Sequence, residues 1–525
     1  MDIFLDILYI AAALSLAVAW WRRCFTASTT PASNSAPLPP GPTGWPVVGN
    51  LFQILLQRRP FMYIVGDFRR IYGPIFTLRM GQRTLVVVSS PDLIHEALVR
   101  KGPLFASRPP DSPIRLLFSS GKCSVNSAPY GPLWRSLRRN LVSEIVSPAR
   151  VRSFAWIRSR AVKLHLDRLR ASAAATAAVD LMPHCRLTIC SILACICFGA
   201  EVPEDKVREM EEVLKDIMMM TTPKLPDFLP VLTPLFRRQL REARKLRRRQ
   251  LDCLLPLVRA RRVFVEEGGG GGPSPFKMVS PAGDAYVDSL FKLQPEGKSR
   301  RLSDEEIVTL VSEVLSAGTD TSATAIEWTM LHLVLDQRAQ ERVYGEVTAV
   351  AEQGKGITEE DVEKMGFLAA AVKETLRRHP PSHFVLSHAA TRDTVLGGYK
   401  VPAAASVEFY TAWLTEDPEV WERPEEWRPE RFMEGGDGWE TDVTGTKGVR
   451  MMPFGVGRRI CPAATLGMLH VQLLLANMVR EFRWEAPPGE VPDPTETFAF
   501  TVVMKKSLKA AIFEREHSKD QLFTT

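Results

Sequence analysis

One of the eight cysteines lies in a sequence context that the other seven lack. Residues 454–462 read FGVGRRICP, so Cys461 follows two glycines and two arginines and comes just before an apolar, helix-forming stretch at 464–479. Glycines allow a backbone to come close to a flat cofactor, because they carry no side chain. Loop N–H groups, a helix N-terminus and positive charge lower the pKa of a thiol and keep it a thiolate. The segment therefore predicts a thiolate ligand to a flat, metal-containing cofactor, with an incidental cysteine in a glycine-rich turn as the alternative.

A long helix is predicted over residues 303–336. Its first residue, a serine, and the glutamate three residues later form the pattern of a capping box, and roughly 33 residues would reach about 50 Å. The sequence AGTDTS at 317–322 breaks the apolar pattern, and polar groups inside a buried helix are unfavourable unless they are used. One explanation is a structural kink made by hydroxyls that bond back to the helix. The other is an oxygen pocket in which Asp320 and Thr321 deliver protons.

The cysteine loop resembles the haem-binding signature of the cytochrome P450 family. Phe454, Gly457, Arg459 and Cys461 stand at matching positions, whereas Ala463 stands where the family usually has glycine. The resemblance implies that Cys461 is the metal ligand of haem b, that Arg459 pairs with a haem propionate and that Phe454 shields the sulfur. It also implies the mainly α fold of that family, with a small β-rich lobe near the N-terminus after a transmembrane anchor.

Further motifs of the same family occur in the expected order. The patch at 317–322 resembles the oxygen-activating motif, with Asp320 and Thr321 as the catalytic pair. Glu374 and Arg377 resemble the E-x-x-R element, and Arg431 lies in a P-E-R-F element. The resemblance implies that Glu374, Arg377 and Arg431 form a buried structural triad behind the haem loop.

Other residues are expected at the haem edge and at a protein partner. Trp134 and Arg138 have the W-x-x-x-R spacing of one helical turn and, by resemblance, reach a propionate, as does His388. Arg135 and Arg139 of the same helix would face an acidic partner, with ordinary solvated charge as the alternative. The partner that the family implies is NADPH–cytochrome P450 reductase, and no glycine-rich dinucleotide fingerprint is present in this chain.

The N-terminus predicts a membrane anchor. Residues 7–21 are nearly all apolar and are followed by two arginines, which favours an uncleaved transmembrane helix over a cleaved signal peptide. We expect an anchor at 1–23, a linker and proline-rich hinge at 24–46 and a catalytic haem domain at 47–525. By resemblance the protein would lie in the endoplasmic reticulum membrane, single-pass, with its catalytic domain facing the cytosol.

The composition does not decide the function, but the net charge argues against nucleic acid as a partner. The net charge of +7 over 525 residues is mild and indicates no nucleic acid partner. The basic run at 241–249 has no interleaved aromatic residues and reads as a solvated or membrane-facing helix. Short strands are expected at 75–78 and 84–88, and a flexible surface loop around five glycines at 268–272. The cysteines are expected to be reduced, most of them as small buried hydrophobes.

Three segments are candidates for the substrate pocket. Residues 105–130, 381–390 and 498–504 are mostly apolar, which predicts a hydrophobic substrate. Arg115 or Lys122 is a candidate to hold a carboxylate near the mouth, and His383 is expected beside the haem edge with His388.

The amino-acid sequences of several segments resemble those of the plant cytochrome P450 family numbered 77. These are FASRPP, SHAATRDTVLGGY and FTVVMKKSL. That family oxidises fatty acids within the chain, by hydroxylation or epoxidation, and feeds cutin synthesis. The open alternatives are a monooxygenase of a terpenoid, steroid or phenolic, a reductase-independent haem-thiolate isomerase or dehydratase, and a haem-binding scaffold or gas sensor.

Overall fold

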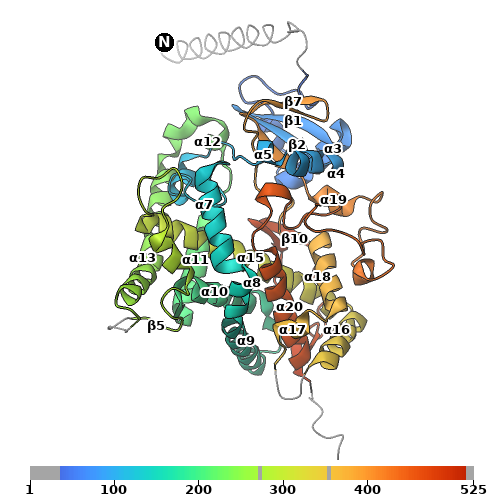
Figure 1. Ribbon diagram of the computed structural model, residues 1–525. Coiled ribbons are helices and arrows are strands. Elements are labelled where there is room, and N and C mark those ends of the chain that lie inside the picture. The colour runs from blue at the N-terminus through green and yellow to red at the C-terminus, as the bar shows by residue number, and fades with distance from the viewer. Residues whose placement is uncertain (1–35, 270–274, 352–355, 516–525) are drawn as a thin grey trace, which may run out of the picture.

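The computed structural model describes residues 36–269, 275–351 and 356–515. The predicted anchor at 1–23 and three of the five consecutive glycines lie outside these ranges. The described chain is mainly helical, with a small β-rich lobe at one end and helices forming the rest of the molecule (Figure 1). The predicted fold class is therefore confirmed for the described residues.

The lobe is built on two valine-rich strands. The predicted strands are present as β1 (Ile75–Met80) and β2 (Arg83–Val88), which pair antiparallel, and β8 (Ser406–Phe409) joins β2 in parallel. Successive side chains of a strand point to opposite faces of a sheet. Accordingly, Val87 packs in one apolar cluster with α3 (Phe61–Tyr72), whereas Val86 and Val88 pack in another on the opposite face. Both faces of β2 are buried, which explains its unbroken apolar end.

The proline-rich hinge is docked on this lobe. Pro40 accepts a hydrogen bond of 2.7 Å from the Thr77 amide, and Pro37 accepts one of 2.7 Å from the Lys400 amide. A Cβ atom on Gly41 would lie 2.0 Å from the Thr77 carbonyl oxygen, so only glycine allows this approach. The described part of the hinge is therefore hydrogen-bonded to the lobe and packs along its edge.

The predicted long helix is α15 (Asp304–Leu335), and it crosses the helical body (Figure 1). The capping box is present, since the Ser303 amide donates to Glu306 at 2.8 Å and the Glu306 amide donates to the Ser303 hydroxyl at 3.3 Å. Helices α10 (Leu181–Phe198) and α20 (Ala464–Glu481) pack against it. Within the described residues, α10 is the one helix long and apolar enough to cross a membrane, and here most of it is buried in the core.

The other helices complete the body and the edge of the lobe. In chain order they are α2 (Leu51–Leu55), α4 (Pro91–His95), η1 (Glu96–Arg100), α5 (Gly102–Phe105), α6 (Pro113–Phe118), α7 (Pro132–Leu141), η2 (Val142–Val146), α8 (Pro148–Ser153), α9 (Ala155–Ala175), α11 (Glu204–Met220), α12 (Leu225–Phe228), η3 (Pro230–Phe236), α13 (Arg237–Glu266), α14 (Tyr286–Lys292), α16 (Gln337–Val350), α17 (Glu359–Val362), α18 (Gly366–Arg378), α19 (Ala412–Glu416), η4 (Pro429–Phe432) and η5 (Gly457–Arg459).

The remaining strands form small sheets. Strands β6 (Thr394–Leu396) and β7 (Tyr399–Val401) form one hairpin, β10 (Glu496–Ala499) and β11 (Thr501–Met504) form another, and the rest are β3 (Val179–Asp180), β4 (Ala200–Glu201), β5 (Lys277–Met278), β9 (Phe482–Glu485) and β12 (Lys509–Glu514).

The basic run lies on α13 and is only partly solvated. Most of its cations are exposed, as predicted, but Arg247 is buried. Its guanidinium donates to the Gln250 side chain at 2.7 Å and to Ser120, Thr309 and the Glu305 carbonyl at 3.0 Å. This arginine therefore fastens α13 to α15, and the prediction of a solvated run was wrong at this position.

Candidate active site

The backbone around Cys461 is shaped by two glycines. Gly455 and Gly457 have φ of +67° and +74°, in the left-handed region that favours glycine. A Cβ atom on Gly457 would lie 1.9 Å from the carbonyl oxygen of Leu98, so the loop packs directly on η1. The Cys461 amide donates to the Phe454 carbonyl at 2.8 Å and closes the loop.

The Cys461 sulfur lies at the start of α20 and is partly accessible. It accepts a hydrogen bond from the Ala463 amide, and the Arg138 guanidinium lies near it. Burial raises the pKa of the Cys461 thiol, while that amide and that guanidinium act in the opposite direction. Ala463 itself has φ −102° and ψ 25°, which any L-residue adopts, so alanine fits where the family usually has glycine.

Three arginines from distant parts of the chain surround the loop. Arg138 donates to the Ile460 carbonyl at 2.6 Å. Arg459 donates to the carbonyls of three residues at 2.6–2.9 Å, and Arg108 donates to the carbonyls of three more at 2.7–2.8 Å. These six acceptors are Ala106, Val125, Ala128, Asn126, Leu386 and Ser387.

No carboxylate of the described chain lies within ion-pair distance of Arg108, Arg138 or Arg459. Burial, and then repulsion by Arg108 and Arg138, lowers the pKa of Arg459 to about 9. Burial lowers the pKa of Arg108 to about 10. Buried cations are normally paired, so this cluster fits a bound group that carries negative charge, as the two propionates of haem b do.

Two ring nitrogens beside the cluster lack partners. Trp134 Nε1 and His388 Nε2 are buried and have no hydrogen-bond partner among the described residues. The Arg459 guanidinium lies 4.5 Å above the Trp134 ring, and Arg108 Nη1 lies 3.5 Å from His388 Nδ1. Burial, followed by Arg108 and Arg459, holds the pKa of His388 well below its usual value, so the ring is neutral. Trp134 and His388 can therefore each donate to an anionic oxygen.

The middle of α15 has one accessible stripe although most of the helix is buried. Ala317 is exposed, and Val314, Gly318 and Thr321 are half-buried. These positions recur at helical spacing and so share a face. The Thr321 hydroxyl donates to the Ala317 carbonyl at 2.7 Å, which places it on this stripe. The small residues leave room for a cofactor and a small molecule, so the residues present fit haem b.

Asp320 points to another face of the same helix. Its carboxylate pairs with the Arg186 guanidinium of α10, and Asp320 is only 4% exposed. Burial raises the pKa of Asp320 despite this partner. The structure therefore places Asp320 and Thr321 next to each other in the chain but on different faces of α15.

The structure brings Glu374, Arg377 and Arg431 together. Arg377 donates to both Glu374 carboxylate oxygens at 2.7 and 2.8 Å, and Arg431 donates to one of them at 3.2 Å. All three side chains are 0% exposed. Arg377 also donates to the Thr415 carbonyl at 2.6 Å, and Arg431 pairs with Asp437 at 2.8 Å. The triad thus joins α18 to the segment that leads into the cysteine loop.

Sequence reasoning missed Arg108, and it did not predict the ion pair of Lys122. Arg108 lies within FASRPP at 105–110, and no local sequence pattern shows that it lies beside Arg459 in the folded chain. Lys122 pairs with Asp111 at 3.7 Å. Arg115 Nε donates to the Thr221 carbonyl at 2.9 Å, and its role as a carboxylate partner stays a prediction.

His383 also lies away from the arginine cluster. It pairs with Glu496 at 3.5 Å and stacks edge-on against Tyr63, so it belongs to a separate cluster at β10. Its expected position beside the haem edge stays a prediction.

Comparisons with known proteins agree with this geometry. The family model described as Cytochrome P450 matches residues 39–512. Cytochrome P450 89A9 of Arabidopsis thaliana is 37% identical over 497 residues, which cover 91% of this chain and 94% of that protein. Tryptamine 5-hydroxylase of Oryza sativa subsp. japonica is 32% identical over 511 residues, covering 95% of each chain.

Solved structures show the same fold. A cyanobacterial CYP120A1 with bound retinoic acid has a TM-score of 0.71 at 21% identity, covering 92% of this chain and 100% of that chain. A zebrafish cytochrome P450 with progesterone has a TM-score of 0.70 at 22% identity, covering 86% and 99%. The chain therefore belongs to the cytochrome P450 family, the haem b monooxygenases that receive their electrons from a reductase.

Proposed function

We propose that this enzyme is a membrane-anchored monooxygenase that inserts one oxygen atom within a fatty acyl chain, by hydroxylation or epoxidation. The observation that carries the substrate class is an apolar hollow with one unpaired cation at its rim. The resemblance of FASRPP and FTVVMKKSL to the plant family numbered 77, which feeds cutin synthesis, supports the same class. Residues 1–23 would hold the enzyme in the endoplasmic reticulum membrane with its catalytic domain in the cytosol.

Different residues of the site would bind the iron and the propionates of haem b. Cys461 would ligate the iron, with Phe454 beside it, and Trp134, Arg138, His388 and Arg459 would hold the propionates together with Arg108. When bound, the haem supplies the reduction of dioxygen and the transfer of one of its atoms to the substrate. Arg135 and Arg139 are exposed on α7 and would face NADPH–cytochrome P450 reductase.

Thr321 and Asp320 would deliver the protons that oxygen cleavage requires. The Thr321 hydroxyl lies on the accessible stripe and can pass a proton to a molecule bound there. Asp320 is the preceding residue, and its carboxyl lies on a different face of α15. It would supply a proton to Thr321 by rotation of its side chain or through a water molecule.

Thr321→Ala is expected to uncouple the reaction. The product formed per NADPH should fall about tenfold or more, and hydrogen peroxide should rise to match, because a positioned proton donor is lost. Thr348→Ala is the control, since Thr348 makes the same bond to the carbonyl four residues earlier on the exposed face of α16. The coupling is measured from product, peroxide and NADPH consumption in the same reaction. Unchanged coupling in Thr321→Ala would show that Thr321 does not deliver protons.

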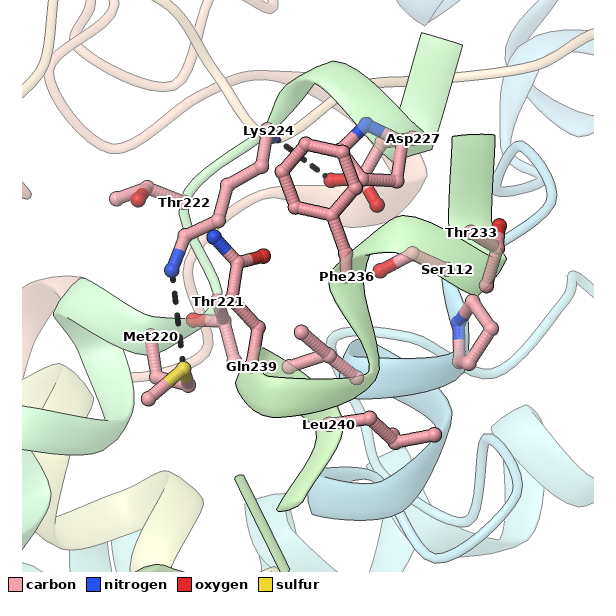
Figure 2. Close-up of a pocket in the computed structure, with 13 residues that line it drawn as sticks. Ser112, Met220, Thr221, Thr222, Lys224, Asp227, Thr233, Phe236, Gln239 and Leu240 are labelled. Atoms are coloured by element: carbon pink, nitrogen blue, oxygen red, sulfur yellow. Dashed lines mark hydrogen bonds between the residues drawn. The ribbon is translucent and has the colours of Figure 1, made fainter. Parts of the chain in front are cut away.

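The hollow lies between α6, α11, α12, η3 and α13, and it is open to solvent, with about 480 Å³ of space when the open solvent is included (Figure 2). Its walls are mainly apolar, and they include Ile114, Met220, Pro226, Phe236 and Leu240.

Lys224 supplies the charge at this hollow. Its ammonium contacts the Met220 sulfur at 3.7 Å, and no carboxylate of the described chain lies within ion-pair distance of it (Figure 2). The Gln239 carboxamide lies close by, as Figure 2 shows. An apolar wall with a cation and an amide at its rim suits an amphiphile with a carboxylate head, so Lys224 would be the carboxylate partner in place of Lys122.

Lys224→Met should weaken the binding of a long-chain fatty acid and spare the alcohol of the same length. The loss should be roughly three- to tenfold in dissociation constant, because a partly exposed ion pair contributes about 1 kcal/mol. Substrate-induced changes in the haem spectrum of the full-length protein measure both ligands. Lys245→Met removes an exposed lysine of α13 as the control. Equal losses for acid and alcohol would show that Lys224 binds no carboxylate.

The experiment that tests the proposed substrate is turnover in microsomes that contain this chain and reductase. Saturated and unsaturated long-chain fatty acids are supplied with and without NADPH, and the products are identified by mass spectrometry. NADPH-dependent in-chain alcohols or epoxides are expected. If haem-loaded enzyme leaves every fatty acid unchanged, the fatty acid assignment is wrong. NADPH-independent rearrangement of a hydroperoxide would instead identify an isomerase or dehydratase.

A ring-containing terpenoid or phenolic is the second candidate class. The relatives named ent-cassadiene C11-alpha-hydroxylase 1 and flavonoid 3'-monooxygenase favour it, at 28–30% identity over most of the chain. The same microsomes supplied with terpenoid and phenolic panels separate the two classes.

A further inference from the structure

A second hollow lies on the side of α15 away from Thr321. It encloses about 270 Å³ between α10, α11 and α15. Asp320 and Glu211 both line it, Arg186 joins them, and the exposed Lys215 stands at its rim. The hollow therefore extends from the surface to the buried carboxyl of Asp320.

Four polar atoms that line this hollow are buried without a partner in the described chain. They are Arg186 Nε, Glu211 Oε1, Thr319 Oγ1 and Asp320 Oδ2. Leaving such an atom unpaired costs about 1–3 kcal/mol, so native proteins satisfy these atoms with ordered water. The hollow is open to solvent, and it has the polar partners and the room to hold a water molecule.

Glu211 carries a carboxyl that can hold a proton at neutral pH. Burial raises its pKa to about 7, and Asp320 acts in the same direction. The cations that act against them come from the elements packed around it, namely Arg168 of α9, Arg186 of α10 and Arg208 of α11. Arg249 of α13 pairs instead with Glu212 and Asp216.

We propose that Glu211 and the water it holds in this hollow carry protons from solvent to Asp320. Glu211 would give its proton to this water, the water would pass a proton to the Asp320 carboxylate, and Glu211 would regain one from solvent, with no change of electrons. Glu211 is thus a positioning residue that acts through Asp320. The inference rests on the proposed role of Asp320 and Thr321 in proton delivery.

Glu211→Gln keeps the shape of the side chain and removes its proton exchange. In the native enzyme, product per NADPH should fall as pH rises through about 7, because Glu211 then loses its proton. In Glu211→Gln the yield should be about tenfold lower at the acidic end, as for a lost proton donor, and independent of pH in this range. Glu211→Asp should restore part of both the yield and the pH dependence.

Glu212→Gln is the matched control. Glu212 is the next residue, but its side chain is 71% exposed and paired with Arg249 on the surface. Its substitution should leave yield and pH profile unchanged. A Glu211→Gln enzyme with native yield and native pH profile would overturn the proposal.

A second measurement does not depend on turnover. Infrared difference spectra of the oxidised, substrate-free protein, titrated across neutral pH, should show protonated carboxyl bands that disappear near pH 7, because burial raises the pKa of Glu211, Glu313 and Glu327 to about 7. One component of these bands should be missing in Glu211→Gln and present in Glu212→Gln. Spectra of Glu211→Gln that match those of the native protein overturn the role of Glu211 even if turnover is normal. A Glu211 component without NADPH-dependent product overturns the proposed function instead.

Discussion

Arg377→Ala is expected to yield almost no haem-loaded protein. The change removes both hydrogen bonds to Glu374 and the bonds to the carbonyls of Thr415, Pro424 and Glu426. Glu374 would remain as a buried carboxylate whose remaining cation is Arg431 at 3.2 Å. Breaking a buried ion pair by removing one partner destabilises a protein by about 3–5 kcal/mol, which is a large part of the stability of a typical domain.

Arg378→Ala provides the matched control for this substitution. Arg378 is the next residue on α18, is partly exposed, and lies 3.8 Å from Glu416 in a surface ion pair. Surface pairs of this kind contribute about 1 kcal/mol or less, so its loss should change haem content and melting temperature little. The ratio of haem absorbance to protein, together with the melting temperature, compares the two variants. Normal haem content in Arg377→Ala would show that the triad does not support the haem loop.

Cys461→Ser is expected to abolish thiolate ligation. A serine hydroxyl stays protonated at neutral pH and is a poor substitute for the soft sulfur that haem-thiolate enzymes use. The reduced, carbon monoxide-bound protein should lose the spectrum typical of a thiolate ligand, and NADPH-dependent turnover should disappear. Cys195→Ser, at a half-buried thiol of α10, should change neither. A thiolate-type spectrum in Cys461→Ser would place the ligand at another cysteine.

Local patterns predicted the elements, because the signals lay within single segments. The capping box at Ser303, the valine-rich strand β2 and the loop around Cys461 each depend on residues close together in the chain. Burial on both faces of β2, and the left-handed φ of Gly455 and Gly457, are consistent with those local patterns.

Side-chain partners were harder to predict, because they depend on tertiary contacts. Arg108 meets Arg459 and His388 only after three distant segments have folded together. Consecutive residues of a helix point to different faces, so Asp320 and Thr321 diverge, and the partner of Asp320, Arg186, comes from a different helix. The raised pKa of Glu211 arises from burial between helices, which no pattern around residue 211 shows.

We expect this enzyme to transfer one atom of dioxygen to its substrate, with protons delivered by Asp320 and Thr321 of α15. The most direct test supplies oxygen gas enriched in a heavy isotope to the enzyme with reductase, NADPH and a long-chain fatty acid. Mass spectrometry of the product should show one heavy oxygen atom per molecule, formed only when NADPH is present. Product whose new oxygen comes from water, or product formed equally well without NADPH, would contradict the account.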